Sequence, residues 1–553
     1  MLKVLILASA LLMGQVCIAQ VDEAMDRTLA NVNPNGIKGT MTFLADDLIE
    51  GRQPGTRGFA VASKYIESRF ISLGLQPGVD GKSYVQPVPF RKGTIDETKS
   101  SVALITKGKK ENLTYGKEIL LSPYFANADS EVSAPLVFVG FGVSAPELSY
   151  DDYADIDVKG KIVVYLNGAP QTFPSNERAF FSSASKLTEA INRGAVGVIS
   201  FSLPTDNRTL WEAAVRRTKQ GTFKWMDKAG KPANSNDPLK AVVNFNPEFA
   251  SKLFANSGKK IEDIYRQAKE GELESFPLNL EAHIKVKTTH AFVQGSNLVG
   301  ILPGSDPKLK DEYVVYAAHL DHFGKGAPVN GDSIYNGAHD NASGVSILLA
   351  IAEAFKSYGP NPSRSIVFAV VTGEEYGLLG SDYFVNNSSI KPENIVANLA
   401  IDMPFFFHPV LDIVPYGAQH SSLSREVESA ASILNLKISP DPFPEQVVFI
   451  RSDHYSFIKK GIPALFIKSG FMTVPEDKVD RSKSDLGWRS TIYHTPQDDM
   501  SQAFDFNAAT THVKVNFLIG LFVARNPNRP VWNKGDFFGG KFGKSVEKID
   551  LKK

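Results

Sequence analysis

Three short apolar runs in the second half of the chain are each followed at once by imidazole or carboxylate side chains. The runs cover residues 312–318, 365–372 and 394–401, and they precede His319, the pair Glu374-Glu375, and Asp402. A helical pattern separates the first two runs, and the alternation of strands and helices predicts a mostly parallel, helix-covered sheet. Because the carboxyl ends of parallel strands meet at one edge of a sheet, we expect these side chains to lie close together.

A glycine-flanked loop at 335–344 separates the first two runs and carries Asp340 to the start of the helix predicted at 342–358. Further along the chain, His494 adds a second imidazole. Imidazole nitrogens and carboxylate oxygens are ligands that zinc takes. One of the adjacent carboxylates Glu374 and Glu375 can bind metal while the other faces a substrate, because neighbours on an extended backbone point in opposite directions. The set suits two metal ions that share Asp340 and leave a position open for water.

His319 and Asp321 lie two residues apart at a strand end, so their side chains point the same way. A carboxylate at this spacing suits a hydrogen bond to the far nitrogen of a metal-bound imidazole, which fixes the orientation of the ring. We therefore expect Asp321 to support His319.

The motifs around these residues resemble those of the bacterial leucyl aminopeptidase-like di-zinc exopeptidases, whose wider group includes glutamate carboxypeptidase-like and transferrin receptor-like proteins. The matching segments are His319-Leu320-Asp321, 336–344, 372–381, Ile401-Asp402-Met403 and Tyr493-His494-Thr495. The resemblance covers about 36–525 and implies an α/β zinc-exopeptidase fold and a metallopeptidase that acts on peptides. It also implies a smaller, inserted, β-rich protease-associated domain.

The resemblance assigns a role to each matching residue. It implies that Asp340 bridges two Zn²⁺ ions, that His319 and Asp402 bind one ion, and that Glu375 and His494 bind the other. Glu374 is then the general base, which takes a proton from a water between the metals and returns it to the leaving amine. A cis peptide bond between Asp340 and Asn341 is also implied.

Substrate contacts are expected from two further stretches. Tyr493 matches a position that can donate a hydrogen bond to the oxyanion, and Arg451-Ser452-Asp453-His454 resembles a substrate-side motif, which makes Arg451, Asp453 and His454 candidates. The run Met403-Pro404-Phe405-Phe406-Phe407 reads either as an apolar wall for a substrate side chain or as ordinary core. His322 and His339 are expected to support the site or the fold.

The rest of the chain divides by composition. We predict a signal peptide at 1–19, a catalytic domain at 20–129 and 286–525, an inserted domain at 130–285, and a tail at 526–553 that lies along the surface and is partly disordered. A basic, polar loop is expected at 216–237. Apolar residues 4–13 after Lys3, with a cut after Ala19, predict secretion or a periplasmic location; Gln15-Val16 before Cys17 argue against lipoprotein anchoring.

Composition narrows the function further. Lys+Arg and Asp+Glu are both 60, so nothing indicates a nucleic-acid binder, and no stretch beyond the N-terminus is apolar enough to span a membrane. The only cysteine, Cys17, lies in the predicted signal peptide, so a mature chain would hold no disulfide. Oligomeric state cannot be read from the sequence.

Two other functional classes compete with the peptidase. A binding protein on this fold would have lost the metal ligands, and a glutaminyl cyclase-like acyltransferase would use a single zinc. The complete set of ligands argues against both. Within the peptidases we favour an aminopeptidase by family frequency, with a carboxypeptidase or dipeptidase as the alternative.

Overall fold

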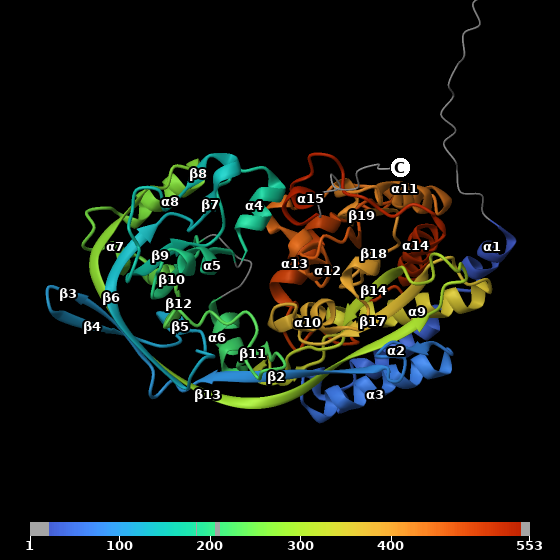
Figure 1. Ribbon diagram of the computed structural model, residues 1–553, viewed down its shortest axis with the longest axis horizontal. Helices are drawn as coiled ribbons and strands as arrows, with labels where there is room; N and C mark the ends of the chain where they lie inside the picture. Colours follow the sequence, from blue (N-terminus) through green and yellow to red (C-terminus); the bar gives the residue numbers. More distant parts are fainter. Residues whose placement is uncertain (1–21, 184, 205–210, 544–553) are drawn as a thin grey trace, which may run out of the picture.

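The computed structural model describes residues 22–183, 185–204 and 211–543. The predicted signal peptide and the last ten residues of the tail lie outside this range. Two β-sheets are joined by one strand, β13 (Ser275–Leu302), which is 28 residues long and runs the length of the molecule (Figure 1). The first half of β13 pairs within one sheet and its second half within the other.

The main sheet has a parallel centre. Strands β17 (Ser365–Val371), β14 (Tyr313–His319), β18 (Ile395–Ala400) and β21 (Ala464–Ser469) lie side by side in that order, all parallel. Antiparallel strands flank them, with β13 beside β17 and β19 (Asp412–Tyr416) beside β21. This confirms the mostly parallel, helix-flanked central sheet predicted from the sequence.

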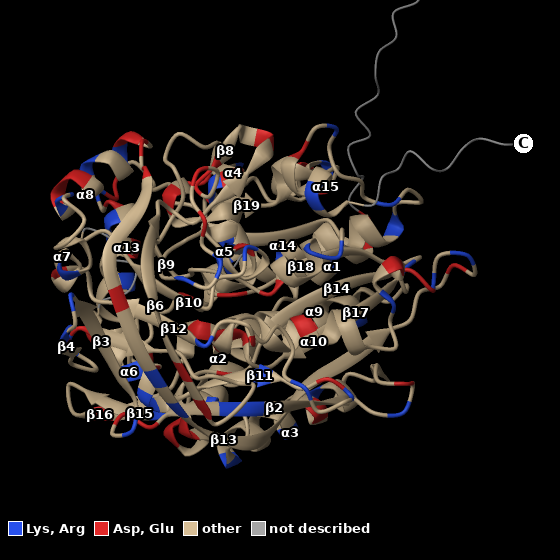
Figure 2. Ribbon diagram, turned by 60° about the vertical axis from the view of Figure 1, so that its left-hand side comes forward, with Lys and Arg blue, Asp and Glu red and all other residues tan. Residues whose placement is uncertain are grey.

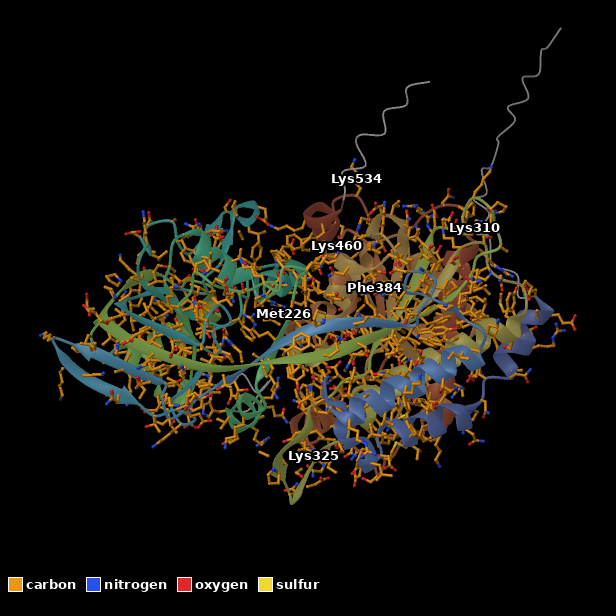
Figure 3. All side chains as sticks on the ribbon, turned by 60° about the horizontal axis from the view of Figure 1, so that its bottom comes forward. Met226, Lys310, Lys325, Phe384, Lys460 and Lys534 are labelled. Carbon is orange, nitrogen blue, oxygen red and sulfur yellow. The ribbon has the colours of Figure 1, made fainter. Side chains whose placement is uncertain are left out.

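Helices cover both faces of the main sheet, which explains why every residue of β17 is buried. One face packs against α2 (Pro34–Leu44), α3 (Arg57–Ser72), α9 (Ser343–Tyr358), α11 (Ser424–Ile433) and α14 (Phe506–Arg525). The opposite face packs against α10 (Leu379–Asn387) and α12 (His454–Ile458) through Phe384 and Phe457. Figure 3 shows Phe384 inside this half of the molecule.

The second sheet has its own hydrophobic core. Its parallel strands are β6 (Asp129–Val139), β9 (Ile162–Leu166), β10 (Gly197–Phe201) and β12 (Ala241–Phe245). Helices α4 (Ser175–Phe181), α5 (Ser185–Asn192), α7 (Ser251–Phe254) and α8 (Ile261–Glu270) lie around it (Figure 1).

The predicted division into a catalytic and an inserted domain stays a prediction, because β13 runs through the boundary at 285/286. Strands β3 (Ser101–Thr106), β4 (Lys109–Leu113) and β5 (Ile119–Leu121) belong to the predicted segment 20–129, yet they pair within the second sheet. By strand pairing, residues 101–121 of that segment go with the second sheet.

One expectation about local structure was wrong. The predicted loop at 216–237 begins inside α6 (Trp211–Gln220) and includes β11 (Thr222–Trp225), which extends the main sheet beside β2 (Val85–Ile95). No residue of α6 is fully buried. The described residues of the tail are mostly exposed or half-buried, but they include a helix, α15 (Phe537–Phe542), whose Phe538 is fully buried against His420 and Phe449.

The surface carries both signs of charge interspersed, in keeping with the zero net charge (Figure 2). The hairpin of β15 (Gly324–Val329) and β16 (Asp332–Tyr335), which carries Lys325, projects from the body of the molecule (Figure 3). Within the described residues, no helix combines the length and the apolar character needed to cross a membrane.

The packing of α14 on β14 requires a glycine at position 520. A Cβ atom there would lie 1.8 Å from the Tyr316 hydroxyl oxygen and 2.7 Å from its Cζ, and that buried hydroxyl donates a 2.7 Å hydrogen bond to the Asn516 carbonyl. We expect Gly520→Ala to lower the free energy of unfolding by about 1–3 kcal/mol through overpacking.

The matched control is Gly39→Ala in α2, where a Cβ meets nothing within 4 Å. It should raise the free energy of unfolding by about 0.5–1 kcal/mol, because alanine loses less backbone entropy in a helix. Urea unfolding of both variants measures the difference, and equal effects would contradict this account of the interface.

Candidate metal centre

The parallel strand register brings three strand ends to one edge of the main sheet. His319 is the last residue of β14 and pairs with Val371, the last residue of β17. Glu374 and Glu375 begin a short 3-10 turn, Glu374–Tyr376, just after β17, and Asp402 lies two residues after β18. The expectation that these side chains share one edge is confirmed.

Asp340 reaches the same place from the loop between β16 and α9. The peptide bond between Asp340 and Asn341 is cis, as the resemblance implied. The Asn341 side chain donates a 2.9 Å hydrogen bond to the Ile401 carbonyl, so the loop is tied to the segment that carries Asp402. The Asp498 carboxylate accepts hydrogen bonds from the backbone N–H groups of His339 at 2.8 Å and Asp340 at 2.9 Å. These bonds fix the backbone on both sides of the Asp340 carboxylate.

Arg52 supports the start of the Asp340 loop through hydrogen bonds to its backbone. Its guanidinium is fully buried and donates hydrogen bonds to the backbone carbonyls of Asn336 at 2.5 Å, Gly337 at 2.9 Å, Leu320 at 2.7 Å and Leu44 at 2.6 Å. Burial lowers the pKa of Arg52 to about 10, against the opposing pull of the nearby carboxylates of Asp498, Asp321 and Asp340. One buried cation thus ties α2, the end of β14 and the Asp340 loop together.

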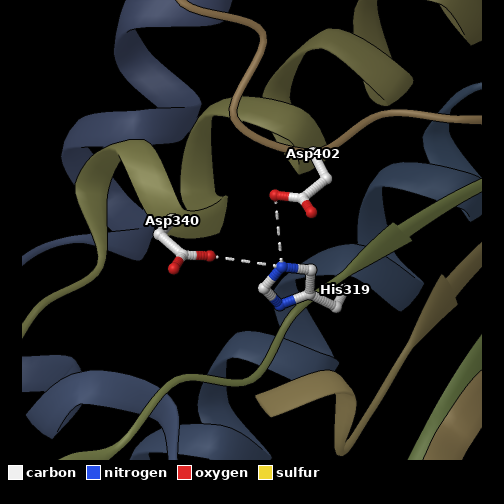
Figure 4. Close-up of side chains that lie close together, drawn as sticks. All are labelled: His319, Asp340 and Asp402. Carbon is white, nitrogen blue, oxygen red and sulfur yellow. Dashed lines mark ion pairs between the residues drawn. The ribbon is translucent and has the colours of Figure 1, made fainter. Parts of the chain in front are cut away.

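Two groups of ligand atoms meet at Asp340. On one side, the His319 Nε2 lies 3.3 Å from Asp340 Oδ1 and 3.6 Å from Asp402 Oδ1 (Figure 4). On the other side, the His494 Nε2 lies 3.1 Å from Asp340 Oδ2 and 3.1 Å from Glu375 Oε2. Each oxygen of Asp340 therefore faces a different imidazole. Glu374 stands beside the first group, with Oε2 4.0 Å from His319 Nε2.

The arrangement of these atoms suits metal ligands better than it suits hydrogen bonds between the side chains. The Nε2 atoms of His319 and His494 and the Oδ1 of Asp402 are buried and have no partner in hydrogen-bonding geometry, in spite of the short separations. The His319 Nδ1–H donates at 3.2 Å to the Asp321 carbonyl, so in the neutral ring the lone pair is on Nε2, toward the carboxylates. Lone pairs that converge on a common point are what ligands of one cation present.

The charge balance points the same way. Burial would raise the pKa of Asp340, but the imidazoles of His319 and His494 hold it well below its usual range. Burial, together with the carboxylates of Glu375, Asp402 and Asp453, raises the pKa of Glu374 well above its usual range. Burial also raises the pKa of Asp321 to about 7. So many buried carboxylates are stable as anions only beside cations, and bound metal ions would supply them.

Asp321 lies beside His319 as expected but makes a different contact. Its carboxyl oxygen is 3.9 Å from the His319 Nδ1, whereas its backbone carbonyl is at 3.2 Å. The carboxylate accepts instead from the backbone N–H groups of Glu374 at 3.2 Å and Glu375 at 3.4 Å. Asp321 thus orients the turn that carries both glutamates, and its main chain orients the imidazole.

The predicted substrate-side residues are not all at the same depth. The Tyr493 ring stacks on His494, with ring centroids 3.6 Å apart, and Arg451 is exposed. Asp453 and His454 are buried; the His454 Nε2–H donates at 2.6 Å to the Phe449 carbonyl, and neither oxygen of Asp453 has a partner. Burial raises the pKa of Asp453 to about 6.

The phenylalanine run packs as core and not as a substrate wall. The rings of Phe405, Phe406 and Phe407 surround the fully buried imidazole of His339, at centroid distances of 4.8, 6.0 and 5.0 Å. Trp488 closes the same cluster at 5.1 Å from His339. Of the two readings left open by the sequence, the structure favours ordinary core.

Sequence reasoning missed several residues that hold the centre. Arg52 and Asp498 were not among the predicted site residues, although Asp498 follows the predicted ligand His494 by only four residues. Arg217, in the stretch read as a loop, donates a 3.1 Å hydrogen bond to His494 Nδ1. A lone arginine in polar sequence gives no signal of burial; only the positive φ of Arg52, 55°, sets it apart, and that is a property of the fold.

Loss of the Arg52 charge should loosen the Asp340 loop. We expect Arg52→Met to lower the free energy of unfolding by about 3–5 kcal/mol, because four nearby buried carboxylates and four carbonyl groups would lose their shared cation and donor. Thermal and urea unfolding measure this loss. Arg69→Met, which removes a half-exposed arginine of α3, is the control and should cost about 1 kcal/mol or less. Comparable losses in both variants would contradict the role given to Arg52.

Comparisons with known proteins agree with this geometry. The sequence profile of Peptidase family M28 matches residues 297–518, which contain every candidate ligand. Aminopeptidase NAALADL1 of Rattus norvegicus is 26% identical over 337 residues, 53% of this chain and 42% of the relative. Aminopeptidase Y of Saccharomyces cerevisiae is 26% identical over 231 residues, 40% of this chain and 38% of the relative. The chain thus spans less than half the length of these curated relatives.

Among solved structures, the aminopeptidase from Aneurinibacillus sp. strain AM-1 matches 91% of this chain and 97% of its own, with a TM-score of 0.53 and 20% sequence identity. That likeness shows a shared fold across both sheets. The profile match, in turn, shows that residues 297–518 are similar to peptidase family M28.

Proposed function

We propose that this protein is a secreted or periplasmic di-zinc exopeptidase that removes N-terminal residues from peptides. The observation that carries the proposal is the double environment of Asp340, whose two oxygens face two separate groups of ligand atoms. The similarity of residues 297–518 to peptidase family M28, and relatives named aminopeptidases and zinc metalloproteases, support the reaction class. The predicted signal peptide supports the location.

In this proposal His319 and Asp402 would hold one Zn²⁺, Glu375 and His494 would hold the other, and Asp340 would bridge them. The distances of 3.1–3.6 Å between the His Nε2 atoms and the facing carboxylates support this pairing. Zinc on the His494 Nε2 requires the proton of that ring to be on Nδ1. Arg217, which can only donate, would then give up its hydrogen bond to Nδ1.

His322 is the rival ligand, because its imidazole also lies close to Asp340 and Glu375. Its Nδ1 makes one 2.5 Å contact, to Glu375 Oε1. That is the geometry of a hydrogen bond, and it leaves Glu375 Oε2 directed toward His494. We therefore assign His322 as the donor that orients Glu375 and keep His494 as the ligand.

When bound, two zinc ions supply Lewis-acid polarisation of the substrate carbonyl and lower the pKa of bound water. The Glu374 carboxylate lies beside the ligands, with Oε2 4.0 Å from His319 Nε2. It is placed to accept the proton of the attacking water and to return it to the leaving amine. Tyr493, stacked on His494, is placed to donate a hydrogen bond to the oxyanion. Asp321 fixes the turn on which Glu374 stands.

Replacement of the base tests this division of roles. Glu374→Gln should keep two zinc ions per chain, because no ligand is removed, and should lower kcat by about 10²–10⁴-fold. Metal content by mass spectrometry and peptide hydrolysis by chromatography measure the two effects. Glu262→Gln on the exposed first turn of α8 is the control and should change neither. Near wild-type turnover by Glu374→Gln would exclude Glu374 as the base.

The choice between the two ends of a peptide can be tested directly. An aminopeptidase must bind a free α-ammonium group, so we expect cleavage of Leu-Gly-Gly and no detectable cleavage of its N-acetylated form. Release of free leucine by the zinc-loaded enzyme is the measurement. Cleavage of the N-acetylated, free-carboxyl peptide alone would replace the aminopeptidase by a carboxypeptidase of the same family.

A further inference from the structure

A cleft of about 1040 Å³ opens between the two halves of the molecule and reaches Tyr493, the neighbour of the candidate ligand His494. One wall comes from the second-sheet half, from residues 167–171 and from α4. The other wall comes from residues 444–451 and from 486–493, at the end of α13 (Arg481–Thr491). Tyr493 lines this cleft and stacks on His494, so one side chain separates the cleft from a candidate ligand.

The charged side chains that line this cleft are mostly cationic. They are Arg178, Arg451, Arg489 and one carboxylate, Glu445. Arg489 is already neutralised, because its Nε donates a 2.8 Å hydrogen bond to the Asp485 carboxylate. Arg178 and Arg451 form no ion pair with any residue in the described part of the chain. They stand on opposite walls, Arg178 on α4 and Arg451 ahead of α12.

Arg178 is the less usual of the two, because part of its guanidinium is out of contact with solvent. Its Nε atom is buried and has no hydrogen-bond partner. A buried donor on a permanently charged group destabilises the fold unless an acceptor reaches it. A guanidinium offers two parallel donors, which match the two oxygens of a carboxylate. The cleft therefore holds donors for an anion that the described residues do not supply.

We propose that Arg178, assisted by Arg451, binds a carboxylate of the peptide substrate on the leaving-group side of the cleaved bond. This inference rests on the proposed peptidase function and gives it a substrate class: short peptides with a free C-terminal carboxylate close to the cleaved bond, or peptides with an acidic residue there. Both sources present the same carboxylate chemistry, and both are specificity contacts rather than catalytic ones.

The position of Arg178 depends on the C-terminal segment of the chain. Helix α15 packs against α4 (Figure 1), with the Phe180 ring 5.5 Å from Phe537 and 6.0 Å from Phe542 by centroids. The Lys541 ammonium lies 5.0 Å from the Phe180 ring centroid and 3.3 Å from the Glu147 carboxylate. These contacts anchor the helix that carries Arg178 to the half of the molecule that carries the ligands. Phe542 is thus a positioning residue for Arg178.

The test compares substrates that differ only in the proposed carboxylate. For the zinc-loaded wild type, kcat/KM for Leu-Gly-Gly should exceed that for its C-terminal amide at least tenfold. The ratio of kcat/KM for Leu-Glu-amide to that for Leu-Gln-amide measures the same preference for a carboxylate on a side chain. Leucine p-nitroanilide carries no carboxylate and reports the chemistry alone.

Arg178→Met should reduce the free-acid preference to less than threefold, mostly through KM, and leave hydrolysis of the anilide within twofold of wild type. Arg178→Lys should keep part of the preference, and Arg451→Met should lower it by a smaller factor. Arg425→Met, on exposed α11 and outside the cleft, should change nothing. Phe542→Ala should weaken the preference severalfold with the anilide unaffected, which a general loss of stability would not do.

A binding measurement separates this inference from the proposed function. Calorimetric titration of the Glu374→Gln variant with Leu-Gly-Gly and with its amide should show tighter binding of the free acid, and Arg178→Met in that background should remove the difference. If the anilide and all peptides resist cleavage while this difference persists, the peptidase proposal fails and the carboxylate site stands. An equal free-acid preference in wild type and Arg178→Met, in both binding and turnover, would overturn the inference.

Discussion

The structure depends on how Asp340 is held. A carboxylate that faces two groups of ligands at once must be held in one orientation. Here hydrogen bonds to the backbone of its loop hold it. Asp498 accepts the N–H groups of His339 and Asp340, and Arg52 binds the carbonyls that precede them. Arg52 and Asp498 lie far apart in the sequence, so the Asp340 loop is held by a residue near the start of the chain and by one near its end. Their own opposite charges also moderate the cost of burying each other.

The sheet supplies the remaining geometry. Because β14, β17 and β18 are parallel and adjacent, their carboxyl ends deliver His319, the two glutamates and Asp402 to one edge without any special loop. Burial of the strands on both faces keeps that edge rigid. The second sheet then closes the approach, since β13 extends from the main sheet into it and α4 forms a wall of the cleft beside Tyr493.

Much of the catalytic half could be predicted from the sequence. The apolar runs before His319, Glu374 and Asp402 predicted strands within one or two residues of those observed, and the helix predicted at 342–358 is observed as α9 (Ser343–Tyr358). Helices α6 and α15 were not predicted. Helix α6 has no fully buried residue and a basic second half, and α15 is six residues long with two glycines, which disfavour a helix.

The sequence by itself determined the chemistry of the centre: which residue types are present, their order, and their places at strand ends. That is possible because strand period and burial are local properties that a short run of residues displays. Only the tertiary structure decided which side of Asp340 each imidazole faces, that Asp321 orients the glutamate turn, and that Arg52 and Arg217 reach the site. Those facts depend on contacts between residues up to several hundred positions apart, which leave no local pattern in the sequence. The ligands of the centre around Asp340 can thus be identified from local sequence, whereas the residues that support them are identified only from the tertiary structure.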